Sequence, residues 1–131
     1  MKPRYFLLND KKKYNDLYRS GFLAFFKKNN LSVSSRGFFD SNFSIFELIM
    51  RVILFSKFSI SSNLRANVIF LFLFWKKGLV IINGLGRYKY SSTFRLFLVF
   101  LFSINSKKTL VFQNFLDFRY FRKHFKLNNI I

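Results

Sequence analysis

Most of the ionisable side chains in this sequence are cations. Of 131 residues, 23 are Lys or Arg and five are Asp or Glu, so the formal net charge at neutral pH is +18. There is no Cys and His124 is the only histidine, which excludes disulfides, thiolate metal sites, cysteine nucleophiles and histidine clusters. Binding of a polyanion is the chemistry that remains, because like charges destabilise a compact fold unless an anionic partner neutralises them. We expect no catalysis, no cofactor, no metal ion and no small-molecule substrate.

Nucleic acid is the polyanion that the charge distribution favours. Residues 76–110 contain seven Lys and Arg and no acid, and no acid lies between Glu47 and Asp117. Cations on a rigid surface contact the phosphates of folded RNA, and aromatic rings among them can stack on unpaired bases. Tyr88 and Tyr90 lie among these cations, where they either stack on a base or cover the core. The predicted RNA-binding residues are Arg65, Lys76, Lys77, Arg87, Lys89, Arg95, Lys107, Lys108, Arg119, Arg122 and Lys123.

An anionic membrane is the other partner to consider, and the lengths of the apolar runs test it. A helix that crosses a bilayer needs about 20 apolar residues. The run at 43–55 is interrupted by Glu47 and Arg51, and a charge at the centre of a spanning helix costs about 2.5–3.5 kcal/mol. We therefore do not expect a membrane partner, and we keep a small Phe-rich inner-membrane protein or respiratory-complex subunit as the alternative function. The remaining apolar runs, all shorter, are residues 66–75, 79–82 and 96–102.

The apolar residues suffice for a core, since 51% of the chain is hydrophobic and 22 residues are Phe. Residues 43–56 are predicted to form a helix with Ser41-Asn42 as its N-cap. Glu47 precedes Arg51 by four residues, which is the favourable order for a helical ion pair. Residues 63–76 form either a second helix or an extended buried segment, since their pattern has no clean period.

Toward the ends of the chain the sequence predicts two further helices. One short helix covers the apolar patch at 21–26, with residues 16–18 in its first turns, and a Ser-rich loop follows at 32–37. A basic, aromatic-rich helix is predicted at 112–126.

Between these helices the sequence predicts a small antiparallel β unit. The β-branched run at 79–82 ends in Asn83-Gly84, a dipeptide typical of hairpin turns. Residues 87–90 alternate basic and aromatic side chains, as a strand with two different faces would. Residues 96–102 are predicted to be a buried strand.

These elements predict an α+β fold, with two or three short helices packed on a small antiparallel β unit. The predicted organisation is a basic N-terminal extension (1–40), an RNA-binding core (41–106) and a basic aromatic C-terminal helix or tail (107–131).

Residues 78–84, Gly-Leu-Val-Ile-Ile-Asn-Gly, resemble the G-x-[IV]-x-[VI]-N-G motif of the S-four RNA-binding module, which is found in a small-subunit ribosomal protein family. That family also has a Ser seven residues after the last Gly, where Ser91 lies here, and a closing apolar strand where Val99–Phe102 lies. The resemblance implies that Gly78, Asn83, Gly84 and Ser91 form the turn of an S-four-like module.

The S-thirteen ribosomal family is a weaker alternative, because residues 82–87 resemble its I-x-G-I-G-R turn. Either resemblance implies a structural constituent of the small ribosomal subunit that binds ribosomal RNA and contacts neighbouring ribosomal proteins. Half of the residues are Phe, Tyr, Met, Ile, Asn or Lys, whose codons are AT-rich. This skew is typical of an organelle genome, and the expected location is the ribosome of the mitochondrial matrix.

Overall fold

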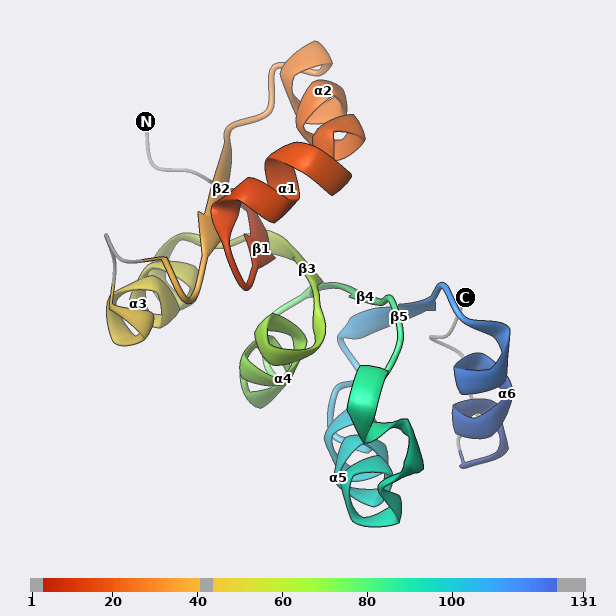
Figure 1. Ribbon diagram of the computed structural model, residues 1–131. Helices are drawn as coiled ribbons and strands as arrows, with labels where there is room; N and C mark the ends of the chain where they lie inside the picture. The colour runs from red at the N-terminus through yellow and green to blue at the C-terminus, as the bar shows by residue number, and fades with distance from the viewer. Residues whose placement is uncertain (1–3, 41–43, 125–131) are drawn as a thin grey trace.

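The computed structural model describes residues 4–40 and 44–124, which form one five-stranded sheet with helices on both faces (Figure 1). All neighbouring strands are parallel, in the order β2-β1-β3-β4-β5. The strands are β1 (Tyr5–Asn9), β2 (Val33–Gly37), β3 (Phe58–Ser62), β4 (Gly78–Ile82) and β5 (Lys108–Phe112). The helices are α1 (Lys12–Tyr18), α2 (Ser20–Lys28), α3 (Ile45–Phe55), α4 (Leu64–Phe72), α5 (Ser92–Ser103) and α6 (Phe115–His124), with a 3₁₀ helix, η1 (Gly86–Tyr90), before α5.

The predicted fold class is therefore wrong. The chain is α/β with an all-parallel sheet and six α-helices among the described residues, and it has no antiparallel β unit there. Its strands come from all three segments of the predicted organisation, since β1 and β2 precede residue 41 and β5 begins at Lys108.

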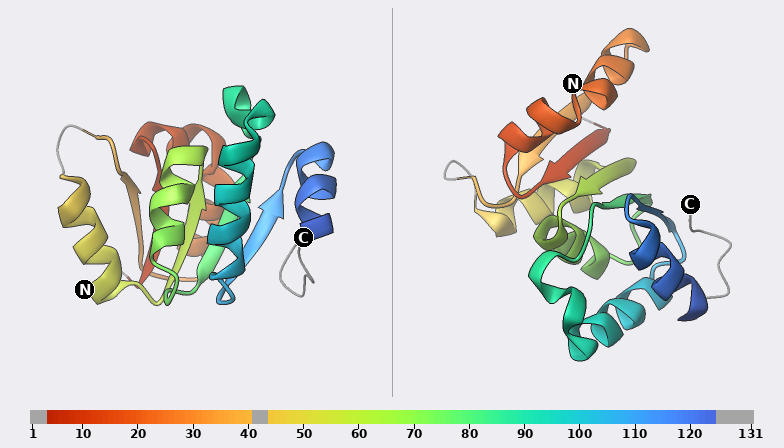
Figure 2. Two further views of the ribbon diagram at one scale, coloured as in Figure 1. Left: turned by 90° about the horizontal axis from the view of Figure 1, so that it is seen from below. Right: turned by 45° about the vertical axis from the view of Figure 1, so that its right-hand side comes forward.

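The direction of each crossover decides which face a helix covers. The chain moves from β1 to β2 in one direction across the sheet, and then from β2 through β3 and β4 to β5 in the other. Because parallel crossovers are right-handed, the two directions place their helices on opposite faces. Figure 2 shows this result, with α3, α4 and α5 on one face and α1 and α2 on the other. We call these the main face and the second face.

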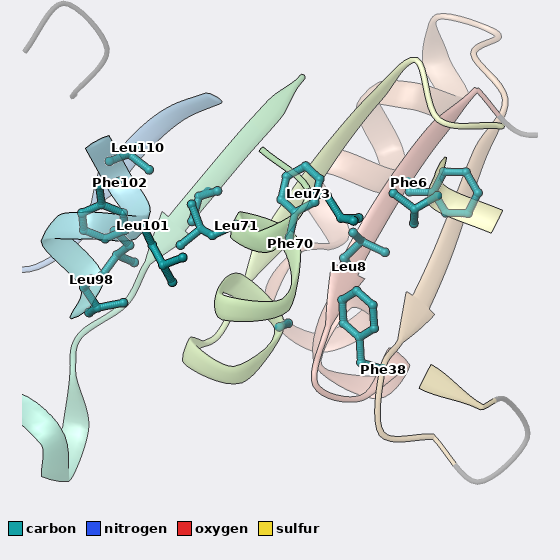
Figure 3. Close-up of a cluster of buried hydrophobic side chains, with 14 of the residues drawn as sticks. Phe6, Leu8, Phe38, Phe70, Leu71, Leu73, Leu98, Leu101, Phe102 and Leu110 are labelled. Carbon is teal, nitrogen blue, oxygen red and sulfur yellow. The ribbon is translucent and has the colours of Figure 1, made fainter. Parts of the chain in front are cut away.

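The main core lies on the main face. Alternate strand residues point into it, among them Phe6 and Leu8 of β1, Val80 and Ile82 of β4 and Leu110 of β5. Against them pack Phe70 and Leu71 of α4 and Leu98 and Leu101 of α5 (Figure 3). Phe121 of α6 belongs to the same core. Burying one such Leu or Phe contributes about 1.5–3 kcal/mol, so this layer is the main source of stability.

The residues after β4 correct the hairpin prediction. Asn83-Gly84 leads into η1 and α5, so residues 87–90 are a 3₁₀ helix and residues 96–102 lie in a helix, not in strands. Ser91 begins α5, because its side-chain oxygen accepts a hydrogen bond of 3.2 Å from the Phe94 amide. Leu98, Leu101 and Phe102 are buried at helical spacing, and this pattern was overlooked when residues 96–102 were predicted to be a strand.

Several helix and strand predictions are confirmed. The predicted helix at 43–56 is α3, and Arg51 lies 3.0 Å from Glu47 as the expected ion pair. Ser44 caps it by accepting from the Glu47 amide at 3.0 Å, whereas the predicted Ser41-Asn42 cap lies outside the described residues. Residues 63–76 contain helix α4, the run at 79–82 belongs to strand β4, and the predicted C-terminal helix contains α6.

The N-terminal predictions are partly wrong. Two helices replace the single predicted one, since Arg19 has a non-helical backbone between α1 and α2. The Ser-rich segment at 32–37 is not a loop but contains the edge strand β2.

Gly78 begins β4 at a point where the backbone has no room for a side chain. A Cβ there would overlap the Ser59 carbonyl oxygen and would lie 2.6 Å from the nearest ring atom of Phe70. Glycine at this position is therefore a packing requirement that lets β3, β4 and α4 come together.

We expect Gly78→Ala to lower the free energy of unfolding by about 1–3 kcal/mol, because the added methyl overpacks the junction of β3, β4 and α4. Urea denaturation measures the change. Gly21→Ala is the matched control: Gly21 lies in α2 with no atom within 4 Å of its would-be Cβ, and alanine there gains up to about 1 kcal/mol of helix propensity. Equal stability of the two variants would contradict the close packing at Gly78.

Candidate functional site

Hydrogen-bonded polar side chains gather at the carboxyl ends of the central strands. From β1 the chain turns first to β2 on one side and then to β3 on the other, so the strand order reverses between β1 and β3. In open parallel sheets this switch point leaves a crevice beyond the strand ends, where ligands commonly bind.

An asparagine stands at the carboxyl end of each of the three central strands. Asn9 is the last residue of β1, Asn63 follows β3 and Asn83 follows β4. The side-chain amide of Asn63 donates to Asn9 Oδ1 at 2.6 Å, and that of Asn83 donates to Asn63 Oδ1 at 2.9 Å. Together they link the three strand ends side by side, across the sheet.

Both ends of this row are anchored by further residues. Asn9 donates to the buried Asn15 of α1 at 3.1 Å, and Asn15 donates in turn to the Leu7 carbonyl at 2.8 Å. At the other end Arg19 donates to Asn83 Oδ1 at 2.8 Å and to the Ser62 hydroxyl at 2.9 Å. Partial burial lowers the pKa of Arg19 from its ordinary value. We call Asn15, Asn9, Asn63 and Asn83 the amide row.

Asp10, the residue after β1, occupies the N-terminus of α4. Its Oδ1 accepts a hydrogen bond of 2.9 Å from the Ala66 amide, and its Oδ2 lies 3.3 Å from Nε of Arg65. A helix N-terminus attracts anions through its free amides and its dipole. Here the chain supplies that anion itself, so an external anion would have to bind to the cations farther out.

An open cleft of about 410 Å³ lies beside Asp10, between the start of α4 and the segment that follows β4. Gly84 and Gly86 form part of its wall with positive φ angles of 152° and 55°, which residues with side chains rarely adopt. Arg65 and Arg87 contribute the cations of the wall. The cleft thus combines two glycines and two guanidinium groups with the Asp10 carboxylate and the side chains of Leu64, Leu85 and Tyr88.

The cations of this edge lie against aromatic rings and remain accessible. The Arg65 side chain is 66% exposed and its guanidinium lies 4.4 Å from the Phe39 ring centre. In η1, Arg87 lies 5.1 Å from the ring of Tyr88, and Lys89 lies 4.7 Å from the ring of Tyr90. Tyr88 packs on Phe94 of α5 at 4.8 Å, whereas Tyr90 is 83% exposed. Tyr90 therefore does not cover the core; its ring is exposed to solvent and contacts the Lys89 ammonium.

The structure does not gather all the predicted RNA-binding residues into one patch. Arg65, Arg87 and Lys89 lie at the carboxyl edge of the sheet, whereas Lys76, Lys77 and Lys107 precede strands and lie at the amino edge. Strands of five residues separate the two edges by roughly 16 Å. Lys76 is also engaged, since it donates to the Ile53 carbonyl at 2.9 Å, and burial lowers its pKa.

The remaining predicted cations belong to α5, α6 and the core. Arg95 lies in the first turn of α5 with its guanidinium 4.4 Å from the Tyr120 ring, so it joins α5 to α6. Arg119, Arg122 and Lys123 are exposed on α6, beside β5. Among the predicted turn residues, Gly78 has a packing role, Asn83 belongs to the amide row, Gly84 lines the cleft and Ser91 caps α5.

Lys108 is too deeply buried to contact RNA. It is 1% exposed, and its Nζ donates to the Leu73 carbonyl at 2.6 Å and to Asn105 Oδ1 at 2.7 Å. Its ammonium group lies 4.6 Å from the Phe70 ring centre. Burial lowers the pKa of Lys108 to about 8, because the protein interior disfavours the charged form. This lysine fixes the ends of α4 and α5 against β5.

Sequence reasoning missed the amide row, Asp10 and Arg19. A usable pattern was present, since each of three short apolar or Ser-rich runs is closed by an asparagine. It was missed because the runs ending at Asn9 and Asn63 had not been assigned as strands. In the part of the chain that the structure describes, no three His, Asp or Glu side chains gather as metal ligands would. Comparison with protein families, with curated proteins and with solved structures finds no significant match to this chain.

We expect Asn63→Ala to be less stable than Asn63→Gly by about 1–2 kcal/mol. Both variants lose the two amide hydrogen bonds, but only glycine relieves the backbone, which has φ 68° and ψ 148° at this position. Both should be less stable than the wild type if the amide row holds the strand ends together. Urea denaturation gives the order, and an alanine variant as stable as the glycine variant would contradict it.

Lys108 makes stability depend on pH in alkaline solution. Its folded pKa of about 8 lies below the ordinary value of 10.5, so between these values the unfolded chain binds more protons than the folded chain. The free energy of unfolding should therefore rise as the pH increases through this interval. Urea titrations at several pH values measure the rise, and Lys108→Met should abolish it. Lys107→Met, a change at the exposed neighbour, should retain it; if it removes the rise too, Lys108 is not the source.

Proposed function

We propose that this chain binds RNA as a structural constituent of a ribosomal subunit. The observation that carries the proposal is the η1 segment at the carboxyl edge, where exposed cations alternate with aromatic rings beside a glycine-walled cleft. Arg87, Lys89 and Arg65 contact phosphates in this proposal, and Tyr90 stacks on an unpaired base. The glycines let the RNA backbone approach closely.

The charge balance supports a polyanion as the partner. The chain has 23 Lys and Arg against five acids, so the acids are too few to neutralise the cations. The ion pairs between described residues include Lys12–Asp16, Arg51–Glu47 and Arg65–Asp10. Lys12–Asp16 lies within α1 and Arg51–Glu47 within α3, and both pairs are exposed. Exposed pairs four residues apart in a helix contribute only about 0.3–0.5 kcal/mol each. Most of the positive charge is therefore left for an external anion to neutralise.

A second property supports a large assembly. Rings and aliphatic side chains are exposed on the outer surfaces of α3, α4 and α5, including Phe46, Leu54, Phe72 and Phe100. Large exposed apolar patches mark sites of protein contact. A protein that needs both RNA and protein neighbours fits a ribonucleoprotein particle, in which ribosomal RNA and neighbouring ribosomal proteins are the partners.

The finer assignments stay predictions. The resemblance of residues 78–84 to the S-four module suggests the small subunit by sequence alone, because these residues form β4 of a parallel sheet and the start of the segment after it, not an antiparallel S-four-like unit. The S-thirteen family is the weaker alternative, and the mitochondrial matrix is inferred from the AT-rich codon skew. The predicted contacts at Lys77, Lys107, Arg119, Arg122 and Lys123 would extend the RNA surface to the amino edge and α6. Among the residues that the structure describes, every helix is too short or too polar to cross a bilayer.

We expect the double variant Arg87→Ala/Lys89→Ala to weaken RNA binding and to flatten its dependence on salt. Each lost phosphate contact reduces the slope of log K against log salt concentration by about 0.7–0.9, so the slope should fall by about 1.5. Filter binding of the full chain to ribosomal RNA at several salt concentrations gives the slope.

Lys27→Ala/Lys28→Ala is the matched control, because it removes the same charge from the far end of α2, away from η1. It should leave most of the slope intact. If both pairs reduce the slope equally, binding depends on net charge alone and the η1 surface has no special role. Tyr90→Leu should lower affinity at every salt concentration with the slope unchanged.

A further inference from the structure

The second face of the sheet has a core of its own that is only partly covered. Leu7 of β1, Ile60 of β3, Ile81 of β4 and Phe26 of α2 are buried in it. Around them lie partly exposed apolar side chains: Tyr5, Phe22, Leu23, Leu31, Val33, Phe58, Leu79 and Val111. The main face has the opposite balance, with most of its strand residues fully buried.

The arrangement of the helices explains the difference. On the second face, α1 and α2 lie over the β1–β2 side of the sheet, and among the described residues no helix lies over β4 and β5 there (Figures 1 and 2). After β5 the chain forms α6, which packs toward the main face: Phe121 lies 5.5 Å from Phe112 and 5.1 Å from Phe102. An open parallel sheet is ordinarily covered by helices on both faces.

An apolar groove of about 740 Å³ lies along this face, between α2 and the strands. Phe22 and Phe25 of α2 form one wall, and Tyr5, Phe58 and Ile60 of β1 and β3 form the other. Phe25 is 57% exposed although it points into an apolar groove. The volume of the groove lies within the range of about 300–1,000 Å³ that is usual for mostly apolar binding clefts.

The charges near the groove indicate what fits it. Among the described residues, Arg19 is the one charged residue of its lining, and its guanidinium is held by Ser62 and Asn83. Lys27 and Lys28 end α2 beside the groove, and Arg4 and Lys57 precede the two strands of its wall, joined by a backbone hydrogen bond of 2.7 Å. The one acid on α1, Asp16, is paired with Lys12 at 3.0 Å. The surroundings of the groove are therefore apolar at the centre and cationic at the margins.

We propose that the groove is the docking site for an amphipathic helix of a neighbouring protein, with an apolar stripe flanked by Asp and Glu. The stripe buries Phe22, Phe25 and Phe58, and the acids meet Lys27 and Lys28 at the end of α2. RNA fits less well, because its phosphates would face the apolar lining. The proposal is independent of RNA binding at η1, since that surface lies at the carboxyl edge of the sheet.

Two fluorescent 18-residue peptides of identical composition test it with the purified full chain. One places Leu at i, i+3, i+4 and i+7 and Glu elsewhere, and the other has the same residues scrambled so that no stripe forms. Fluorescence anisotropy should show that the striped peptide binds at least tenfold more tightly. Equal binding of the two peptides would mean simple charge attraction and would overturn the proposal.

Phe25→Ser should weaken binding of the striped peptide at least fivefold. Phe46→Ser is the matched control, because it removes one 73% exposed ring from α3 on the main face with no change of charge, and it should not alter binding. Urea midpoints of both variants verify that each is folded. Equal losses in the two variants would overturn the assignment to the groove.

A photo-crosslinking amino acid at position 25 gives a second readout in the native particle that contains the chain. A crosslink that maps to an acidic amphipathic helix of another protein supports the proposal. A crosslink to RNA, to a second copy of the chain or to residues 125–131 of the same chain overturns it.

Discussion

The amide row is the constraint on which the site depends. Strands of five residues form short ladders, and the backbone alone leaves their carboxyl ends weakly fixed. A carboxamide both donates and accepts, so Asn15, Asn9, Asn63 and Asn83 continue one another from strand to strand, which a carboxylate alone would not allow. Each link contributes only about 1 kcal/mol net, but breaking the buried Asn9–Asn15 link or the partly buried Asn63–Asn9 link leaves an amide group unpaired, which costs about 1–3 kcal/mol. The row thereby resists separation of the central strands and keeps the cleft in place.

A neutral row also determines where charge can act. Asp10 neutralises the α4 N-terminus and pairs with Arg65, so the charges next to the end of β1 are compensated within the chain. Among the described residues, no acidic side chain pairs with Arg87 or Lys89 of η1. Their cation–π contacts with Tyr88 and Tyr90 hold the side chains without removing the charge. A site of this kind suits an extended polyanion along the edge better than a small phosphate enclosed at a helix terminus.

The sequence predicted the elements whose local pattern agrees with the final fold. Glu47, Arg51 and the apolar period of α3 lie within one helix, and the β-branched residues of β4 suit a strand buried on both faces. Asn83-Gly84 misled, because this dipeptide indicates a hairpin only when a second strand follows, and Ser91 begins a helix instead.

Strands β2 and β3 were missed since Ser34, Ser35, Ser59 and Ser61 interrupt their apolar pattern. Their place in the sheet comes from pairing with β1, which is a property of the tertiary fold. Lys108 was assigned to RNA because burial of a lysine is rare, and only the geometry of Leu73 and Asn105 reveals it.

Two features of the isolated chain lower its free energy of unfolding, and they lie in different parts of the molecule. Positive charge accumulates at the edges of the sheet and on α6, where it destabilises the compact state, whereas incomplete burial affects the second face. A ligand that binds only the folded chain stabilises it in proportion to the logarithm of its concentration over its dissociation constant. RNA bound along η1 would neutralise part of the positive charge. An amphipathic helix docked on the second face would bury its exposed apolar side chains. Because the two proposed surfaces share few residues, their effects would add, so binding of both partners would stabilise the chain more than binding of either one alone.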